Sequence, residues 1–219
     1  MSWFPKPEAR IFCAAVNYAA HREEMGRGES GAHPMLFLRT PQSLVRAGEP
    51  LIRPAVSDCF DYEGELAAVI GKPGRRITRE AALSHVAGWT PFLDGSIRDW
   101  QRHNAQFTPG KNFDASGAIG PELVPADAFG DYKAHDLTTR VNGEVLQHTP
   151  ISLMLFDTEA LIAYISAFTE LREGDIIATG TCGGVGEKRV PQRWLKPGDI
   201  VEVEVSGIPI LRNPVVAEA

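Results

Sequence analysis

Two glutamates separated by a single residue, Glu63 and Glu65, open an apolar run that ends at Ile70. Alternate side chains of a β-strand point to the same face, so the two carboxylates are expected to project together. Buried like charges repel each other unless a cation compensates them, and carboxylate oxygens suit hard ions such as Mg²⁺, Mn²⁺ or Ca²⁺ better than zinc. An isolated pair of this kind is more often the solvated face of an edge strand. The run from Leu66 to Ile70 reads as buried on both faces, and a third acid, Asp94, occurs in a second motif, so a cation site is the favoured interpretation.

A histidine and a glutamate three residues apart, His21 and Glu24, form a second candidate for chemistry. Residues at i and i+3 of a helix are neighbours. A carboxylate beside an imidazole orients the ring as a general base that can deprotonate water. The alternative is an incidental pair on an exposed helix, and the spacing alone favours that alternative.

Three further polar residues are candidates for a binding pocket. Lys111, in a loop with glycine and proline, is a candidate for oxyanion stabilisation or proton donation, although such a lysine is usually solvated. Arg98 suits bidentate binding of a substrate carboxylate, or equally a structural ion pair with Asp99 or a core acid. Thr181 follows a Thr-Gly pair and offers a hydroxyl group for the carboxylate of a substrate.

The composition excludes several classes of protein. The 219 residues carry a formal net charge of -6, which argues against nucleic acid or an anionic membrane as the main partner. The three cysteines, Cys13, Cys59 and Cys182, are scattered and suggest neither a disulfide framework nor a thiolate metal site. No apolar stretch approaches the ~18 residues that span a bilayer, and the N-terminus lacks a signal-peptide pattern. We therefore expect a cytoplasmic protein that forms one domain over residues 1–219.

The 21 glycines and 16 prolines favour many short strands over a helical bundle. Strands are expected at 11–16 and 35–38, and Asn142-Gly143 predicts a hairpin with a type I′ turn. Thr78 is expected to cap a helix that runs to about residue 85. The clearest helix is predicted from 157 to 171, with Asp157 as its N-cap and one apolar face formed by Leu161, Tyr164, Ile165 and Phe168. The pattern predicts a mixed, β-rich α+β fold with a few peripheral helices.

The motifs, taken in order, resemble those of the fumarylacetoacetate hydrolase family, specifically its short, single-domain, acylpyruvate hydrolase-like members. The resemblance runs from about residue 11 to residue 214. It rests on Val16-Asn17-Tyr18, His21 with Glu24, Phe37-Leu38-Arg39, Asp61-Tyr62-Glu63-Gly64-Glu65, Asp94-Gly95-Ser96-Ile97-Arg98-Asp99, Gly110-Lys111-Asn112-Phe113-Asp114, Gly120-Pro121, Val141-Asn142-Gly143-Glu144, Gly174-Asp175 and Ala178-Thr179-Gly180-Thr181.

The resemblance implies a β-roll around a metal site, usually in a homodimer. It implies Mg²⁺ or Mn²⁺ held by three carboxylates, which correspond to Glu63, Glu65 and Asp94. The implied catalytic residues are His21, Glu24 and Lys111, and the implied substrate contacts are Arg39, Arg98, Gln101 and Thr181. Arg39 stands where a lysine is common in the family, and a guanidinium binds a carboxylate as a fork but cannot donate a proton.

The implied substrates are small 2-oxo acids and β-diketo acids. Our first expectation is metal-dependent hydrolysis of a C–C bond in an acylpyruvate-type acid through an enolate, with water activated by His21 and Glu24. A second possibility is decarboxylation or isomerisation of a 2-oxo diacid of the oxaloacetate or hydroxymuconate type. A third is a catalytically silent metal-binding subunit. The glycines of the loop 26–33 make a closing lid plausible.

Overall fold

The computed structural model describes residues 3–26, 28 and 31–219, and an eight-stranded mixed sheet forms its frame. The strand order is β2-β1-β13-β6-β7-β9-β3, with β10 paired to β7 outside that path. The bounds are β1 Ile11–Ala15, β2 Met35–Arg39, β3 Leu44–Arg46, β6 Gly64–Ile70, β7 Val86–Leu93, β9 Gly117–Ile119, β10 Val124–Pro125 and β13 Ile176–Ala178. The loop 26–33 that was expected to act as a lid lies partly outside the described residues.

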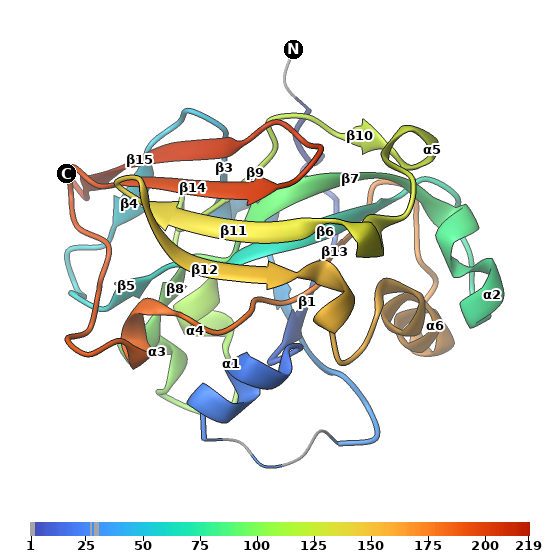
Figure 1. The fold of residues 1–219 in the computed structure, drawn as a ribbon, viewed down its shortest axis with the longest axis horizontal. Helices are drawn as coiled ribbons and strands as arrows, with labels where there is room; N and C mark the ends of the chain where they lie inside the picture. Colours follow the sequence, from blue (N-terminus) through green and yellow to red (C-terminus); the bar gives the residue numbers. More distant parts are fainter. Residues whose placement is uncertain (1–2, 27, 29–30) are drawn as a thin grey trace.

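A second, five-stranded sheet packs against this frame (Figure 1). Its order is β12-β11-β14-β15-β4, and the small pair β5-β8 stands apart from both sheets. The bounds are β4 Leu51–Arg53, β5 Phe60–Asp61, β8 Ser96–Ile97, β11 Asp136–Val141, β12 Glu144–Pro150, β14 Ile200–Val205 and β15 Leu211–Ala217. The β-rich fold that the sequence predicted is therefore confirmed.

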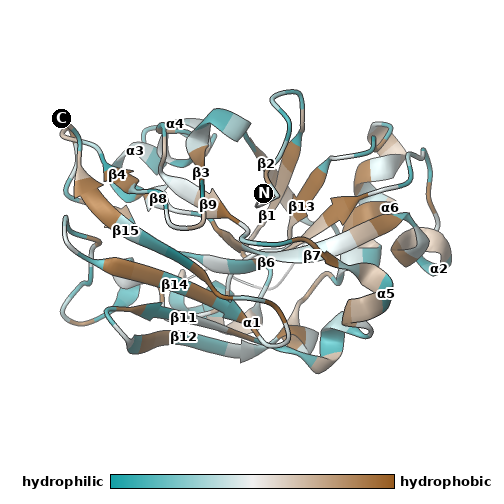
Figure 2. Cartoon of the chain, turned by 90° about the horizontal axis from the view of Figure 1, so that it is seen from above, coloured by the Kyte–Doolittle hydropathy of each residue, from teal (hydrophilic) through white to brown (hydrophobic). Residues whose placement is uncertain are grey.

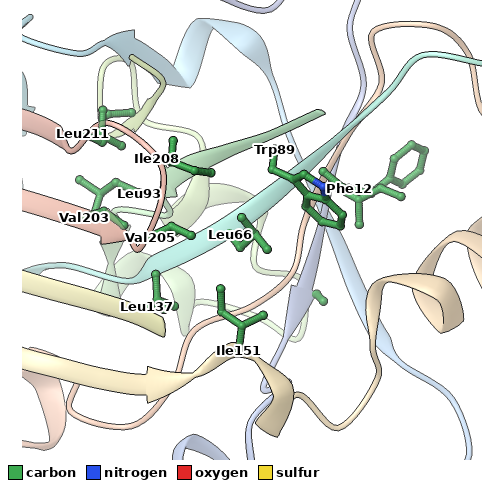
Figure 3. Close-up of a cluster of buried hydrophobic side chains, with 14 of the residues drawn as sticks. Phe12, Leu66, Trp89, Leu93, Leu137, Ile151, Val203, Val205, Ile208 and Leu211 are labelled. Atoms are coloured by element: carbon green, nitrogen blue, oxygen red, sulfur yellow. The ribbon is translucent and has the colours of Figure 1, made fainter. Parts of the chain in front are cut away.

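The main hydrophobic core lies between the two sheets. Figure 3 shows Leu66 of β6, Leu137 of β11 and Val205 of β14 in one cluster. In Figure 2 the hydrophobic residues run along strands such as β13 and β14, while the connecting loops are mostly hydrophilic. β6 is buried on both faces: Leu66 belongs to this cluster, whereas Ala67 and Val69 belong to a second buried cluster on the other face. Continuous apolar character in this strand is what a sheet covered on both sides requires.

The helices are short and peripheral (Figure 1). Their bounds are α1 Ala19–Glu24, α2 Arg79–Ala82, α3 Arg98–Gln101, α4 Thr108–Lys111, α5 Ala126–Phe129 and α6 Thr158–Phe168, with 3₁₀ turns at Pro41–Ser43, Leu83–His85, Tyr132–Ala134, Ile151–Leu153 and Gly186–Lys188. None of the helices in the described ranges has the length and hydrophobicity needed to span a bilayer.

The predicted turns and caps were right in two cases. The hairpin at Asn142-Gly143 joins β11 to β12, and both residues have the positive φ angles, 54° and 82°, that such a turn needs. Asp157 caps α6 by accepting a hydrogen bond from the Ala160 N–H at 2.9 Å.

Other local predictions were wrong in detail. Thr78 stands at the N-cap position of α2, but its side chain makes no capping hydrogen bond, and the helix gives way to a 3₁₀ turn after Ala82. α6 ends at Phe168 instead of Leu171, and Phe168 is exposed because the buried face turns through Leu161, Ile162 and Ile165.

Candidate active site and metal centre

Three carboxylates meet where β6 and β7 pair. Glu63 immediately precedes β6, Glu65 lies in it, and Asp94 immediately follows β7. The strands are antiparallel with Gly64 opposite Leu93, so the start of one lies beside the end of the other. One candidate ligand oxygen from each acid lies within 4.8 Å of those of the other two, and all three side chains are buried. The strand pairing thus gathers acids that are about 30 residues apart in the chain.

Three basic side chains bind two of these acids. Lys111 Nζ lies 2.6 Å from Glu63 Oε2 and 2.5 Å from Asp94 Oδ2. Arg98 Nη2 donates to Glu63 Oε1 at 2.6 Å, and Arg39 Nη1 donates to Asp94 Oδ1 at 2.5 Å. Each of these contacts is buried, so the charges are weakly screened and strongly coupled.

The pKa shifts follow from these contacts. Burial alone would raise the pKa of Glu63, but the charges of Arg98 and Lys111 outweigh it and hold that pKa well below its usual range. Burial acts to lower the pKa of Lys111, yet Asp94 and Glu63 raise it above its usual value, so the ammonium group stays charged. The lysine therefore sits in the site as a fixed positive charge.

Glu65 differs from the other two acids because it forms no ion pair with any residue that the structure describes. It accepts one hydrogen bond, from the Gly180 N–H at 2.8 Å. Burial, followed by the charges of Asp94 and Glu63, raises its pKa well above the usual value. Burial and the two neighbouring acids thus disfavour the ionised form of Glu65, and a further cation would favour it. An all-carboxylate donor set fits Mg²⁺ or Mn²⁺, so these residues suit the expected ion.

The His21–Glu24 pair is formed as predicted. α1 carries both residues, and His21 Nδ1 lies 2.7 Å from Glu24 Oε1. The second oxygen of Glu24 accepts the Gly184 N–H at 2.9 Å, which fixes the carboxylate from both sides. A carboxylate only accepts hydrogen bonds, so this pattern assigns the imidazole proton to Nδ1 and leaves Nε2 as a base. His21 is buried and contributes to the wall of the cavity described next.

A cavity of about 460 Å³ opens above the acids. Its wall comes from the end of β1, from α1, β2, α3 and α4, and from the loop between α3 and α4; Figure 1 shows α1, α3 and α4 in the same part of the molecule. The lining residues are Ala14, Ala15, Val16, His21, Met25, Met35, Phe37, Glu63, Glu65, Arg98, Gln101, Arg102, Asn104, Ala105, Phe107, Lys111 and Thr181.

Val16, at the point where β1 turns into α1, has a φ of 53°. This left-handed conformation is rare for a β-branched residue, and strain of this kind persists only where the surrounding structure holds it. The turn carries α1, and with it His21, to the wall of the cavity that Val16 also lines. Local strain therefore accompanies the placement of the candidate base.

Arg98 was expected either to bind a substrate carboxylate or to form an ion pair with an acid of the protein, and the structure contains such ion pairs. Its Nε donates to Asp61 Oδ2 at 2.8 Å, its Nη2 to Glu63, and its Nη1 to Gln101 Oε1 at 3.0 Å. It pairs with buried acids instead of Asp99, and it lines the cavity as well. Gln101 also lines the cavity.

Arg39 is the one predicted substrate contact that the structure does not bring to the cavity wall. Its guanidinium lies behind Asp94, and it donates to the Ser43 hydroxyl at 3.1 Å, the Gly95 carbonyl at 2.9 Å and the Ser116 hydroxyl at 2.8 Å. These contacts suit a residue that holds Asp94 in place. The prediction depended on a bidentate contact between the guanidinium and a substrate carboxylate. In the structure the guanidinium donates its hydrogen bonds to the protein's own groups instead.

Several residues of the site carried no recognised signal. Asp61 belongs to one of the motifs that resemble the family. Its partner Arg98 lies 37 residues further along the chain, so the sequence spacing could not reveal this contact. Gln147 of β12 accepts the Gly64 N–H at 3.0 Å and donates to Thr181 Oγ1 at 2.8 Å. A buried glutamine in an alternating strand was its only signal.

Arg102 is also in the cavity wall and was not predicted. Its spacing of four residues from Arg98 would have placed the two arginines on one helix face, and this signal was available in the sequence.

Comparison with known proteins identifies the class. The family model for the fumarylacetoacetate (FAA) hydrolase C-terminal domain matches residues 10–216. This chain belongs to the fumarylacetoacetate hydrolase family, and the resemblance found in the sequence is confirmed.

Its relatives divide among different reactions. A mitochondrial oxaloacetate tautomerase, fahd2 of Xenopus laevis, is 40% identical over 94% of this chain, which spans 65% of that relative. The structure of a 5-carboxymethyl-2-hydroxymuconate delta-isomerase from Mycobacterium smegmatis is 36% identical, with a TM-score of 0.87 over 100% of this chain and 82% of that one. A fumarylpyruvate hydrolase from Pseudomonas aeruginosa, solved with Mn²⁺ and pyruvate, is 33% identical, with a TM-score of 0.87 over 95% and 90% of the two chains.

Proposed function

We propose that this chain interconverts the keto and enol forms of a short 2-oxo diacid of the oxaloacetate type. The observation that carries the proposal is the His21–Glu24 pair, because His21 lines the same cavity as Glu63, Glu65 and Lys111 and the pair uses only its Nδ1. Relatives that are about 40% identical are named as oxaloacetate tautomerases. The expected hydrolase activity becomes the second candidate.

His21 moves the proton in this proposal. In the direction from keto to enol, Nε2 accepts the proton from the carbon beside the 2-oxo group, and the electron pair of that C–H bond forms the C=C bond while the carbonyl π pair moves to the oxygen. The imidazolium of His21 then returns the proton to that oxygen, which gives the enol. Glu24 holds the ring and stabilises the imidazolium that forms, while Lys111 provides fixed positive charge to the wall. The reverse direction returns the proton to carbon.

Glu63, Glu65 and Asp94 would hold Mg²⁺ or Mn²⁺ in this site. The bound ion supplies positive charge that stabilises an enolate oxygen. Arg98 and Arg39 keep Glu63 and Asp94 oriented through the hydrogen bonds described above.

The same pair of residues supports hydrolysis of an acylpyruvate-type acid. In that reaction His21 Nε2 takes a proton from water, the hydroxide oxygen bonds to the distal carbonyl carbon, and the C–C bond breaks. The electron pair of the broken bond forms the enolate of pyruvate, which then takes up the proton. The similarity to a fumarylpyruvate hydrolase, 33% identical to this chain, supports this candidate. A silent subunit is the least favoured reading because the carboxylates and the dyad are all present.

The deciding assay follows oxaloacetate and a panel of acylpyruvates by NMR, with the protein stripped of metal and then reloaded with Mg²⁺ or Mn²⁺. Faster exchange between enol and keto oxaloacetate, with the acylpyruvates intact, supports the tautomerase. Two acids formed from an acylpyruvate support the hydrolase. Release of CO₂ with pyruvate from oxaloacetate means that the site acts as a decarboxylase.

His21 is the residue whose removal tests the proton-transfer step. We predict that His21→Ala lowers kcat by about 10²- to 10⁴-fold, the usual contribution of a positioned base. The affinity for Mn²⁺, measured by calorimetry, should stay unchanged because His21 is not among the candidate ligands. The matched control is His148→Asn on β12, where the imidazole contacts Thr138. Full activity of His21→Ala would remove the general base from the proposal.

A further inference from the structure

Among the residues that the structure describes, the cavity wall carries three arginine or lysine side chains, and two of them already bind buried acids. Lys111 binds Glu63 and Asp94, and Arg98 binds Asp61, Glu63 and Gln101. Both side chains are 2% exposed. Neither can turn to a new anion without breaking a buried ion pair, which is costly.

Arg102, the third cation, is differently placed. It follows α3 directly and lines the same cavity, but 55% of its side chain is exposed. Its one side-chain contact within the described residues is an ion pair with Glu187. A guanidinium has five N–H donors in a fork, so Arg102 retains donors that can face the cavity.

Glu187 is a buried partner for this exposed arginine. Its side chain is 5% exposed, and its Oε2 has no hydrogen-bond partner among the described residues. Its own backbone N–H donates to Asp61 Oδ2 at 3.1 Å, and the same oxygen of Asp61 accepts from Arg98. The carboxylate that holds Arg102 is thus tied to the network that orients Glu63. Arg102 is therefore held at the wall with less freedom than an ordinary surface arginine.

Within the described part of the cavity wall, no further guanidinium or ammonium group is available besides these three. Apolar side chains contribute much of it, including those of Met25, Met35, Phe37 and Phe107. An uncharged substrate tail would contact these groups, whereas a second carboxylate would require a positive partner to compensate its desolvation. Of the wall residues that the structure describes, Arg102 is the exposed arginine that can supply it.

We propose that Arg102 selects substrates with a second carboxylate, which its guanidinium binds at the end of the substrate away from the carboxylate triad, and that Glu187 positions the guanidinium for this contact. The inference rests on the proposed function, because it assumes that the 2-oxo acid end is bound at Glu63, Glu65 and Asp94. It names the residue that recognises the second carboxylate of the proposed 2-oxo diacid. A fork-shaped bidentate contact suits an arginine and is lost with a lysine.

Direct binding tests this selection without any turnover. The probes are pyruvate and 2-oxoglutarate, two 2-oxo acids that differ in the presence of a second carboxylate, titrated calorimetrically into the Mg²⁺-loaded protein. The wild type should prefer 2-oxoglutarate, and Arg102→Gln should weaken 2-oxoglutarate binding by about 10- to 100-fold, the size expected for a charged hydrogen-bonded contact. Pyruvate affinity should stay within twofold. Equal loss for both acids, or no preference in the wild type, would overturn the proposal.

Three further variants keep the result interpretable. Arg79→Gln is the matched control, since Arg79 is also 55% exposed with a single ion pair, to Asp157, and lies outside the cavity. Arg102→Lys keeps a positive charge opposite Glu187 and should retain an intermediate preference. The double change Arg102→Gln with Glu187→Gln removes the buried unpaired charge, so a folding defect in the single variant cannot hide the binding result.

Kinetics separate this inference from the function on which it rests. With oxaloacetate, the loss in Arg102→Gln should fall on KM and not on kcat, because the second carboxylate stays ionised throughout and its contact with Arg102 is made equally in the ground state and the transition state. Selective 2-oxoglutarate binding in a wild type without tautomerase activity would contradict the proposed function but support the selection of dicarboxylates by Arg102. Tautomerase activity with an unchanged KM in Arg102→Gln would support the proposed function and contradict the selection by Arg102.

Discussion

At the scale of single residues, Asn17 is the buried amide that ties the turn before α1 to the rest of the structure. Its Nδ2 donates to the carbonyls of Phe156 and Thr179 at 2.8 and 2.7 Å, and its Oδ1 accepts the Phe156 N–H at 2.8 Å. Asn17 is 1% exposed, so water cannot replace these partners. The amide therefore fixes the segment from which His21 projects.

We predict that Asn17→Ala lowers the free energy of unfolding by about 2–4 kcal/mol, because it leaves several buried backbone groups unpaired. Asn17→Asp should cost at least as much, since an acceptor then faces two carbonyl oxygens. Urea denaturation measures both effects. The control is Asn104→Ala, which removes one exposed hydrogen bond to Gln106 and should change stability by less than about 0.5 kcal/mol. An equal change in both alanine variants would contradict this account.

The sequence indicated these residues unequally. The positions of Glu63, Glu65 and Asp94, and the contact between His21 and Glu24, could be anticipated because they rest on short-range spacing or on ordered motifs. The role of Asn17 in joining segments more than 130 residues apart could not. The sequence indicated that Arg39 belongs to the site, but it did not indicate that the guanidinium lies behind Asp94, because its partners come from the tertiary fold.

At the scale of secondary-structure elements, α3 and α4 touch through a glycine. A Cβ added to Gly110 would lie 2.4 Å from the backbone nitrogen of Gln101 and 2.5 Å from its Cα. Ordinary contact needs a greater separation, so any larger residue must push the helices apart. The close approach keeps Lys111 of α4 and Gln101 of α3 on one cavity wall.

We predict that Gly110→Ala destabilises the protein by about 1–3 kcal/mol through overpacking. Activity should fall by about 10- to 100-fold because a shift of about 1 Å misplaces catalytic groups. Gly28→Ala is the control, since a Cβ at Gly28 meets open space. Thermal unfolding and kcat/KM provide the two readouts. A variant with unchanged kcat/KM would show that the site tolerates the separation of α3 from α4.

The turn that leads into β14 is held by Asp199. Its carboxylate accepts hydrogen bonds from Arg193 Nη1 and Nη2 at 2.9 Å each, from the Lys196 N–H at 2.8 Å and from Asn142 Nδ2 at 2.8 Å. Burial alone would raise its pKa, but these hydrogen bonds outweigh it and lower the pKa below the usual value. The folded state therefore favours the ionised carboxylate.

A lowered pKa means that this stabilisation is present above the usual pKa of about 4 and is lost as pH falls through the lowered value. We predict that Asp199→Asn costs about 2 kcal/mol at pH 7, and that its stability converges with that of the wild type on acidification below pH 4. Urea unfolding at several pH values measures this. Asp114→Asn, on the surface, is the control. A constant difference across the pH range would mean that the charge of Asp199 is not what stabilises the turn.

Elements with a strong local signal were predictable, and those that tertiary contacts define were not. Asn142-Gly143 and the cap of α6 depend on their own residues. The end of α6 and the four-residue helices α3 and α4 are set by what they pack against. The sequence predicted the strands near the site better than the short helices that complete its wall.

At the scale of the whole molecule, the pairing of strands in the two sheets determines which motifs, distant in the sequence, lie together. β6 lies centrally in the larger sheet, between β13 and β7, and its outer face packs on the smaller sheet. Residues that follow β13 and β7 therefore converge on the start of β6, which brings Thr181 and Asp94 to Glu65. The pairing of strands could not be derived from the sequence without the family resemblance. The homodimer that the resemblance implies stays a prediction.

The burial of Glu65 has a consequence for the stability of the entire fold. A buried carboxylate beside Asp94 and Glu63, without a basic partner among the described residues, costs free energy in the metal-free protein. A bound divalent cation removes that cost and also stabilises the folded state by mass action, by about 2.7 kcal/mol at a hundredfold excess over Kd. Metal removal should therefore lower Tm by about 5–10 °C for a chain of this length.

We predict that the order of thermal stability between the wild type and Glu65→Gln depends on whether metal is present. Without metal the variant should unfold at a higher temperature than the wild type, because the amide keeps the shape and removes the buried charge. With Mg²⁺ or Mn²⁺ its Tm should rise much less than that of the wild type, because one carboxylate ligand is lost. Thermal scans of EDTA-treated and reloaded protein measure this, with Glu173→Gln at an exposed position as the control. A full metal-dependent rise in Tm for Glu65→Gln would place the cation away from this triad.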